Sequence, residues 1–190
     1  MTELIDACLR PVTQADADRM LAWRNQPDVA QWMYSDHVIT PDEHEAFMAR
    51  ALGDPTRRYW IIELDGEPVG LANLAEISQN DRKASWAFYL ADPATRGKGL
   101  GAFVEVFVLD FAFRRLGLNK LCCEVLIENE AVWKTHESFG FVREALYRAH
   151  VWKAGVPRDV VGLGLLADEW EAVRPASVAR LRAKGFEIGD

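Results

Sequence analysis

Hydrophobic and polar positions alternate with a strand-like period through much of the first half of the chain. Short apolar runs at 7–12, 58–64, 69–77 and 85–90 are typical of β-strands, and Asp65-Gly66 between the second and third runs is typical of a hairpin turn. Strands joined by such short turns pair antiparallel. The first half of the chain is therefore expected to contain an antiparallel meander.

Helical spacing separates these strands and continues into the second half of the chain. Thr13 with Asp16 resembles a capping box, and Thr40-Pro41 places a proline at a first helical position. The pattern as a whole predicts helices at 13–26, 41–53, 99–116, 130–139 and 167–185, a short helix or turn at 28–38, and strands at 120–127, 141–153 and 159–166. Because no repeat, low-complexity linker or composition break interrupts these elements, we expect one α/β (α+β) domain over residues 1–190.

The segment Arg96-Gly97-Lys98-Gly99-Leu100-Gly101 is the most informative stretch, because three glycines at alternate positions stand before a predicted helix. A bare backbone turn at a helix N-terminus offers free N–H donors and the positive end of the helix dipole, which together form an anion site. No G-x-x-x-x-G-K-[ST] string occurs, so a P-loop is excluded. Gly97, Gly99 and Ala102 match the Rossmann fingerprint, but antiparallel strands precede it and residues 91–96 separate it from its strand. A plain tight turn before the helix is the other alternative.

Charge and composition exclude several classes of function. The net charge of −7 argues against a protein that tracks nucleic-acid phosphates, and no apolar run approaches the ~20 residues that span a bilayer. The N-terminal residues lack the basic and apolar regions of a signal peptide. The cysteines (Cys8, Cys122 and Cys123) and the histidines have no metal-ligand spacing. We therefore expect a cytoplasmic protein that binds no metal, nucleic acid or membrane.

Four signatures, in order along nearly the whole chain, resemble the GNAT superfamily of acyl-CoA-dependent N-acetyltransferases. Residues 96–101 fit the pattern [QR]-x-x-G-x-[GA], and 86–92 resemble the family's splayed strand. Asn119-Lys120-Leu121 opens the next strand, while 129–131 and 136–141 resemble the signature N-x-x-[AS]…Y-E-K-x-G-F. The resemblance implies the GNAT acyl-CoA N-acyltransferase fold, a central, mostly antiparallel mixed sheet of about seven strands flanked by helices.

The resemblance also implies acetyl-CoA as co-substrate, with its pyrophosphate at the glycine loop and its pantetheine arm paired with the exposed strand backbone. The glycines leave room for several backbone N–H donors to converge on a pyrophosphate. The implied cofactor-binding residues are Phe88, Tyr89, Leu90, Arg96, Gly97, Lys98, Gly99, Leu100, Gly101, Ala102, Asn129 and Lys134. Asn129 is expected to cap the helix that it precedes, with its amide near the cofactor amides.

Acetyl transfer to an amine needs a base for the amine proton and an acid for the leaving thiolate. Glu124 interrupts an apolar strand on the face of Cys122 and Leu126, so a desolvated carboxylate facing the cleft is a candidate base. A core-edge carboxylate paired with an arginine is the alternative. His136 stands where the family signature carries tyrosine, and an imidazolium is a competent acid; the alternative is a surface histidine.

Residues before the glycine loop are expected to hold the acceptor. The stretches 23–29, 32–34, His37 and 40–44 resemble the GNAT subgroup that acetylates UDP-4-amino-4,6-dideoxy-N-acetyl-β-L-altrosamine, a step of pseudaminic acid biosynthesis and flagellin glycosylation. This resemblance implies direct attack of the sugar 4-amine on the thioester in a ternary complex. The implied substrate-binding residues are Arg24 for the diphosphate, Asn25, and Met33, Tyr34, Phe47 and Trp86 as an apolar wall.

Other acceptors and roles are compatible with the same residues. Glu144 and the hairpin ending at 158–161 resemble the branch of ribosomal-protein acetyltransferases, which implies a protein α-amine as acceptor. A small-molecule amine and a non-enzymatic, regulatory acyl-CoA-binding protein are further alternatives. A salt bridge from Arg24 to Asp28 competes with the diphosphate role. The assembly is left open, with a homodimer as one option.

Overall fold

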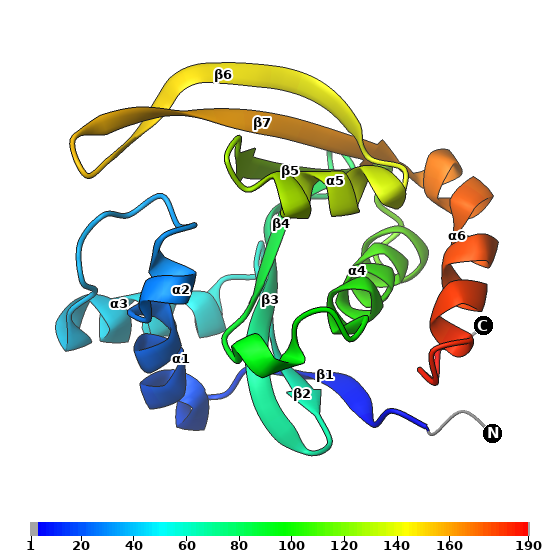
Figure 1. The fold of residues 1–190 in the computed structure, drawn as a ribbon, viewed down its shortest axis with the longest axis horizontal. Helices are drawn as coiled ribbons and strands as arrows, with labels where there is room; N and C mark the ends of the chain where they lie inside the picture. Colours follow the sequence, from blue (N-terminus) through cyan, green and yellow to red (C-terminus); the bar gives the residue numbers. More distant parts are fainter. Residues whose placement is uncertain (1–3, 190) are drawn as a thin grey trace.

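Seven strands form one mixed sheet in the computed structural model, which describes residues 4–189. The strands are β1 (Ala7–Pro11), β2 (Arg58–Leu64), β3 (Glu67–Ser78), β4 (Lys83–Leu90), β5 (Lys120–Leu126), β6 (Val142–Lys153) and β7 (Val156–Leu166). Their order is β1-β2-β3-β4-β5-β7-β6, and every neighbouring pair is antiparallel except β4 and β5. The expected seven-stranded, mostly antiparallel mixed sheet is confirmed (Figure 1).

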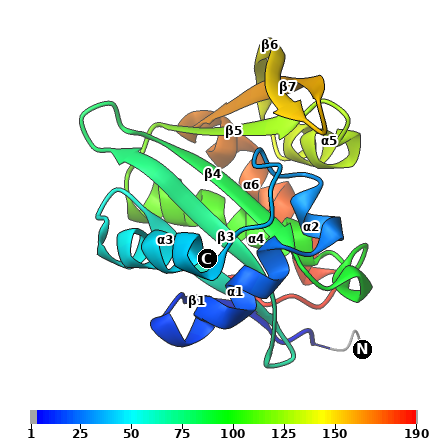
Figure 2. The ribbon, with the colours of Figure 1, turned by 90° about the vertical axis from the view of Figure 1, so that its left-hand side faces the viewer.

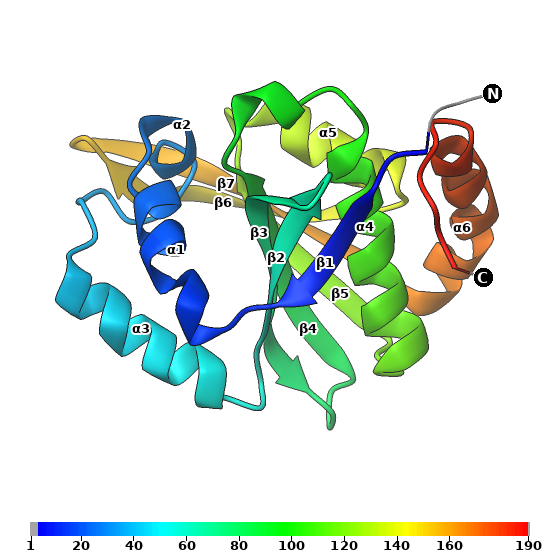
Figure 3. The same cartoon turned by 90° about the horizontal axis from the view of Figure 1, so that it is seen from below.

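Helices cover both faces of this sheet. They are α1 (Ala17–Arg24), α2 (Pro27–Ala30), α3 (Pro41–Gly53), α4 (Leu100–Asp110), α5 (Glu130–Ser138) and α6 (Ala167–Arg182). Short 3₁₀ helices are η1 (Gln14–Asp16) and η2 (Pro93–Thr95), and the π-helix η3 (Phe111–Arg115) continues α4. Helices α1 to α3 lie on one side of the sheet, and α4 and α6 lie on the other (Figures 1 and 3). The crossover from β4 to the parallel strand β5 runs through α4, as βαβ connections do.

Local sequence signals account for most element boundaries. The Thr40 hydroxyl accepts a hydrogen bond from the Glu43 N–H at 3.3 Å, and the Glu43 carboxylate accepts one from the Thr40 N–H at 2.8 Å. This capping box with Pro41 confirms the predicted start of α3. At the end of β6, Ala154 and Gly155 both have positive φ and close the hairpin, so β7 begins at Val156, three residues earlier than predicted.

The two largest hydrophobic cores lie on opposite faces of the sheet. The larger one fills the space between the sheet and α4, α5 and α6, and includes Trp60, Ile62, Leu74, Trp86, Val104, Leu121, Leu163 and Trp170. A smaller one joins Val12, Met20, Met48, Ile61 and Leu71 between the sheet and α1 and α3. Ile61 and Ile62 are neighbours in β2, and each is buried in a different core, as strand alternation requires.

Candidate active site

Strands β4 and β5 separate soon after they begin. They pair in parallel only between Lys83–Ser85 and Lys120–Cys122, and beyond these residues their paths diverge (Figure 2). The backbone of 86–90 pairs with β3 on its other side and has no strand partner on the side of β5 within residues 4–189. An extended amide-bearing chain can pair with such an edge. This opening, which we call the splay, lies where the pantetheine arm was expected.

The glycine loop stands at the end of β4, where α4 begins. Gly97 and Gly99 have φ values of +77° and +92°, a backbone conformation that residues with a side chain rarely adopt. Gly99 is the N-cap residue of α4, so the first N–H groups of the helix have no carbonyl acceptor within the helix. The bare loop therefore fits a pyrophosphate, which several N–H donors can approach together.

Charged side chains flank this loop. Arg96 lies 3.6 Å from the Asp28 carboxylate and donates a long hydrogen bond of 3.5 Å to the Leu90 carbonyl. Lys98 is exposed. Asp28 was considered as a partner for Arg24, and the structure pairs it with Arg96 instead. The loop thus brings positive charge to the start of α4, although Asp28 already compensates the charge of Arg96.

Two expected cofactor residues lie at the start of α5. The Asn129 carbonyl accepts hydrogen bonds from the N–H groups of Val132 and Trp133, but its side chain makes no capping hydrogen bond. Asn129 is therefore the N-cap residue of α5, as expected, but it caps the helix through its backbone carbonyl and not through its side chain. Lys134 pairs with Glu130 at 2.7 Å on the exposed surface of the helix. Asn129 is half-buried, whereas Lys134 is exposed.

Glu124 lies on β5 and faces the side of α1 to α3. One of its carboxylate oxygens accepts a hydrogen bond of 2.7 Å from the Tyr34 hydroxyl, which comes from the loop after α2. Partial burial and this hydrogen bond raise the pKa of Tyr34, so the phenol stays protonated and donates. The carboxylate is exposed, not desolvated as expected, and its partner is a tyrosine, not an arginine. It is open to a proton from solvent or from an amine.

Arg24 lies at the C-terminal end of α1 and contacts Ser35, the residue that follows Tyr34 in the chain. Its guanidinium donates a short hydrogen bond to the Ser35 hydroxyl. Within residues 4–189 no carboxylate lies within ion-pair distance of Arg24, and burial lowers its pKa. Asn25, the next residue, uses its amide differently, because it donates to the Ile39 carbonyl at 2.9 Å and accepts from the Ile39 N–H at 2.8 Å. These two hydrogen bonds hold the loop and leave one N–H donor and one lone pair of the amide for a ligand.

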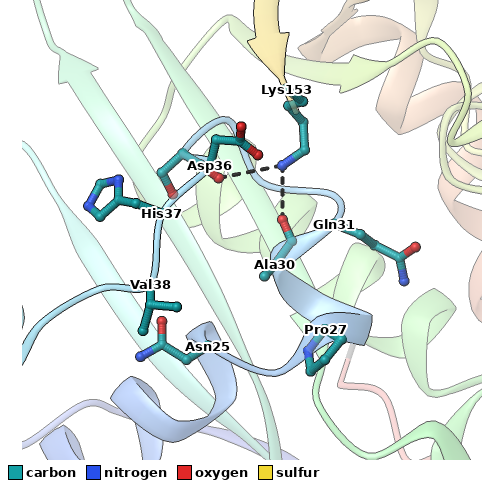
Figure 4. A pocket seen from close by; sticks show the side chains of 9 residues that line it. Asn25, Pro27, Ala30, Gln31, Asp36, His37, Val38 and Lys153 are labelled. Carbon is teal, nitrogen blue, oxygen red and sulfur yellow. Dashed lines mark hydrogen bonds between the residues drawn. The ribbon is translucent and has the colours of Figure 1, made fainter. Parts of the chain in front are cut away.

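The β6–β7 hairpin reaches across to the loop that carries Tyr34. The Lys153 ammonium donates to the carbonyls of Ala30 at 3.1 Å and Met33 at 2.6 Å, and the Ala154 N–H donates to the Asp36 carboxylate at 2.6 Å. We call the joined segments 30–36 and 153–154 the arch. Lys153 points from the hairpin into a cavity of about 230 Å³ on the outside of the arch, lined also by Asn25, Gln31 and His37 (Figure 4).

The histidine expected to act as acid is buried beneath the splay. His136 is 4% exposed, and its Nδ1 lies 2.8 Å from the Glu105 carboxylate of α4. Burial alone would lower the pKa of His136, but the charge and hydrogen bond of Glu105, together with the interaction with Cys123, outweigh it and raise the pKa to about 10. His136 is therefore not the surface residue considered as the alternative. It is a buried imidazolium.

The expected apolar wall is not assembled as a unit. Trp86 is 3% exposed and lies on the opposite face of the sheet from Tyr34, 5.2 Å from the His136 ring between centroids. In β4, Ala84 and Trp86 are buried toward α4, so alternation places Tyr89 on the side of α1. Phe47 packs on Tyr59 in the smaller core. Trp86 thus belongs with the histidine and not with the acceptor, a correction that strand alternation could have provided.

Several residues of the site were not found from the sequence. Glu105 is the one charged residue inside the apolar run of α4, a pattern that signals a buried partner. His150 lies 6.2 Å from the Tyr34 ring and 5.0 Å from the Tyr147 ring, so the arch side of Glu124 is lined with aromatic and imidazole groups. Their proximity arises from the long β6–β7 hairpin, and no local motif marks it.

Residues 4–189 show neither a membrane-spanning helix nor a metal-binding cluster. None of the helices there combines the length and apolar character needed to cross a membrane. Within the same residues, histidine, cysteine and carboxylate side chains do not gather in a group that could hold a metal ion.

Comparison with known proteins identifies the family of the chain. The family model of the acetyltransferase (GNAT) domain matches residues 6–142. The chain is 26% identical to a putative ribosomal N-acetyltransferase of Bacillus subtilis, over 86% of this chain and 92% of that protein. It is 28% identical to the spermidine N(1)-acetyltransferase of Escherichia coli K12, over 86% and 88%, and 25% identical to the acetyltransferase PseH of Campylobacter jejuni, over 66% and 76%.

A solved structure shows the same fold. The spermidine N-acetyltransferase of Vibrio cholerae, in complex with CoA and spermine, superposes with a TM-score of 0.81 at 23% identity, over 87% of this chain and 98% of that one. This likeness shows the fold, and the family match shows the class of reaction and its co-substrate. The chain belongs to the GNAT acetyltransferase family and is an acetyl-CoA-dependent N-acetyltransferase.

Proposed function

We propose that the protein acetylates the 4-amine of a UDP-linked amino-dideoxy sugar by direct attack on the acetyl-CoA thioester in a ternary complex. The uncompensated charge of Arg24 is the observation that supports this acceptor. Arg24 is a half-buried cation beside the Tyr34–Glu124 pair, and no described carboxylate compensates its charge. A diphosphate would supply the missing negative charge.

The surroundings of Arg24 favour an anionic acceptor over a polycation. Tyr89 lies close enough to interact electrostatically with the guanidinium, and burial raises the pKa of its phenol, which therefore stays neutral. A partly desolvated guanidinium without an anion is costly, so a bound phosphate would stabilise the site. A polyamine would instead bring more positive charge to the same place.

Glu124 is proposed as the base. Its exposed carboxylate lies on the arch side of β5, held by the Tyr34 hydroxyl at 2.7 Å. The carboxylate can take the proton of an incoming ammonium, directly or through water, and Tyr34 keeps it oriented. The Tyr34 ring, with Met33 beside it in the chain, provides the remaining apolar surface for a 6-deoxy sugar.

His136 is proposed as the acid. It is buried under the splay, and its raised pKa of about 10 keeps it protonated at neutral pH. An imidazolium there can stabilise the negative charge that develops on the leaving sulfur and supply its proton. The phosphates of the cofactor are assigned to the backbone N–H groups of 97–102, and its amides to the β4 edge and Asn129.

The relatives support this acceptor only in part. One of them, PseH, carries the name of the pseudaminic pathway enzyme that the sequence resembles, but others are named for ribosomal protein and spermidine. A protein α-amine or a polyamine therefore remains the alternative acceptor. The uncompensated positive charge of Arg24 favours the nucleotide sugar over both of these acceptors.

A thiol-release assay with acetyl-CoA tests the proposal. The acceptor panel contains a UDP-4-amino-4,6-dideoxy sugar, the same amino sugar without the nucleotide, spermidine, and peptides with free N-termini. We expect the nucleotide sugar to react fastest. If peptides or spermidine were acetylated far faster than any amino-sugar nucleotide, the proposed acceptor would be wrong.

A pair of variants tests whether Arg24 binds the diphosphate of the acceptor. Arg24→Ala removes one charge-assisted contact worth about 1.5–3 kcal/mol, so the KM for the nucleotide sugar should rise about 10- to 100-fold. The KM for acetyl-CoA and for the sugar without nucleotide should not change. Arg19→Ala, on the same helix and 41% exposed, is the matched control.

A further inference from the structure

Glu105 is a carboxylate in an unusual place. It lies in the middle of α4, is 0% exposed, and its neighbours Val104 and Val106 are 0% exposed as well. One oxygen contacts His136 at 2.8 Å, and the other has no hydrogen-bond partner within residues 4–189. A buried carboxylate with a single charged partner is expensive, and packing alone would favour an apolar residue at this position.

His136 links Glu105 to both walls of the splay. The rings of Trp86 and Phe88 in β4 lie 5.2 and 6.5 Å from the imidazole, and Cys123 in β5 is close enough to interact with it electrostatically. Both strands thus contact the imidazole beside the residues where they stop pairing with each other. The histidine therefore lies directly beneath the opening between the strands.

The charged and titratable groups around the imidazole are few. Among the described residues, Glu105 of α4 and Cys123 of β5 are the groups that act on it electrostatically. Strand β4 contributes the rings of Trp86 and Phe88, and the segment after α5 contributes the Phe141 ring, 5.4 Å away. Glu105 is therefore the group that can keep the imidazole both charged and fixed.

We propose that Glu105 is a positioning residue that holds His136 as an imidazolium under the splay, where it stabilises and then protonates the leaving thiolate of CoA. The inference rests on the proposed role of His136 as the acid. Glu105 acts through the histidine and touches no substrate. The usual tyrosine of the family signature is thereby replaced by a charged pair whose carboxylate half comes from α4.

The proton balance follows from the two groups. As the amine nitrogen bonds to the acetyl carbon, Glu124 accepts the amine proton. The bond from the acetyl carbon to sulfur breaks, the electron pair goes to sulfur, and His136 supplies the proton that makes the thiol. Neutral His136 then recovers a proton from solvent, and the Glu105 charge favours that recovery.

The test measures the thiol of bound CoA and needs no acceptor. Ultraviolet absorbance distinguishes thiolate from thiol, so the thiol can be titrated in the complex of the full-length protein with CoA. An imidazolium within ~4–6 Å should lower the apparent pKa of the bound thiol by about 1–3 pH units relative to free CoA. Glu105→Gln should return it close to the free value, and Glu105→Asp should retain most of the shift.

A matched control and a second variant keep the test decisive. Glu137→Gln changes the residue next to His136 in α5, whose carboxylate instead pairs with Arg143 on the surface, and should leave the shift intact. His136→Tyr should abolish the shift even if Glu105→Gln does not fold. CoA affinity is measured by calorimetry in each case.

The outcomes separate the two hypotheses. The positioning role of Glu105 is wrong if CoA binds but its thiol titrates identically in wild type and Glu105→Gln, or if His136→Tyr keeps the shift in the thiol pKa. Either result would leave the assignment of acetyl-transfer activity unaffected. If the thiol shift appears but no amino-sugar nucleotide is acetylated, the acceptor proposal fails and the role of Glu105 stands.

Discussion

Replacing His136 by phenylalanine should destabilise the protein far more than an ordinary core substitution. The change leaves the Glu105 carboxylate 0% exposed with no charged partner among residues 4–189, since its only ion pair there is the 2.8 Å contact with His136. Breaking a buried ion pair by removing one partner costs about 3–5 kcal/mol. For a chain of this length, each kcal/mol lowers Tm by roughly 2–4 °C, so Tm should fall by about 6–20 °C.

The double variant Glu105→Leu/His136→Phe is the essential comparison. It removes both charges and leaves an apolar site among Trp86, Phe88 and Phe141, so it should be as stable as wild type or more stable by up to ~4 kcal/mol. Urea denaturation at pH 7, followed by the fluorescence of the seven tryptophans, measures all three proteins. Since the two residues touch, their effects should be strongly non-additive.

The pH dependence gives an independent check with a defined sign. The pKa of His136 is raised from 6.5 to about 10 on folding, so its contribution to stability is complete below pH 6.5 and is lost as the pH rises through about 10. Wild type should therefore lose stability over this interval relative to the double variant. A His136→Phe protein as stable as wild type, or a pH-independent difference between wild type and the double variant, would refute the buried charged pair.

Three further predictions concern the rest of the site. Glu124→Gln should lower kcat on the order of 10²-fold or more in the thiol-release assay with little change in the KM for acetyl-CoA, and near-full turnover would reassign the residue to structure. Gly101→Val places a side chain against Phe88, because even a Cβ at this position would lie 3.5 Å from that ring. CoA affinity, measured by calorimetry, should therefore fall about tenfold or more while the fold persists, and unchanged affinity would argue against the glycine loop as the cofactor site. Lys153→Met removes the contacts that close the arch, so the acceptor KM should rise about tenfold, the equivalent of ~1.4 kcal/mol, and an unchanged KM would separate the arch from the acceptor.

Features encoded by neighbouring residues could be predicted from the sequence. The capping box of Thr40 and Glu43 defines the start of α3, and the glycines at 97 and 99 adopt the left-handed conformations that a bare turn before a helix requires. The strands of the meander and the terminal helix follow from apolar periodicity in the same way. These signals act over a few residues and need no knowledge of the rest of the fold.

Pairings between distant residues could not be predicted in this way. Asp28 is four residues from Arg24, the spacing of a helical salt bridge, but α1 ends at Arg24 and Asp28 pairs with Arg96 instead. His136 meets Glu105 only because α4 and α5 pack on the same face of the sheet. Trp86 was misassigned for a different reason, since its chemistry was considered without the alternation that buries Ala84 and Trp86 together.

The sheet divides the proposed proton chemistry between its two faces. Glu124 and Tyr34 lie on the side of α1 to α3, whereas Glu105 and His136 lie on the side of α4 and α5. Through a continuous sheet these groups could not act on one reaction centre. Because β4 and β5 stop pairing after Ser85 and Cys122, an acyl thioester between them can be reached by an amine from one face and by an imidazolium from the other. The separation also prevents the base from neutralising the acid directly, since the Glu105 carboxylate, and not Glu124, is the partner of the imidazolium.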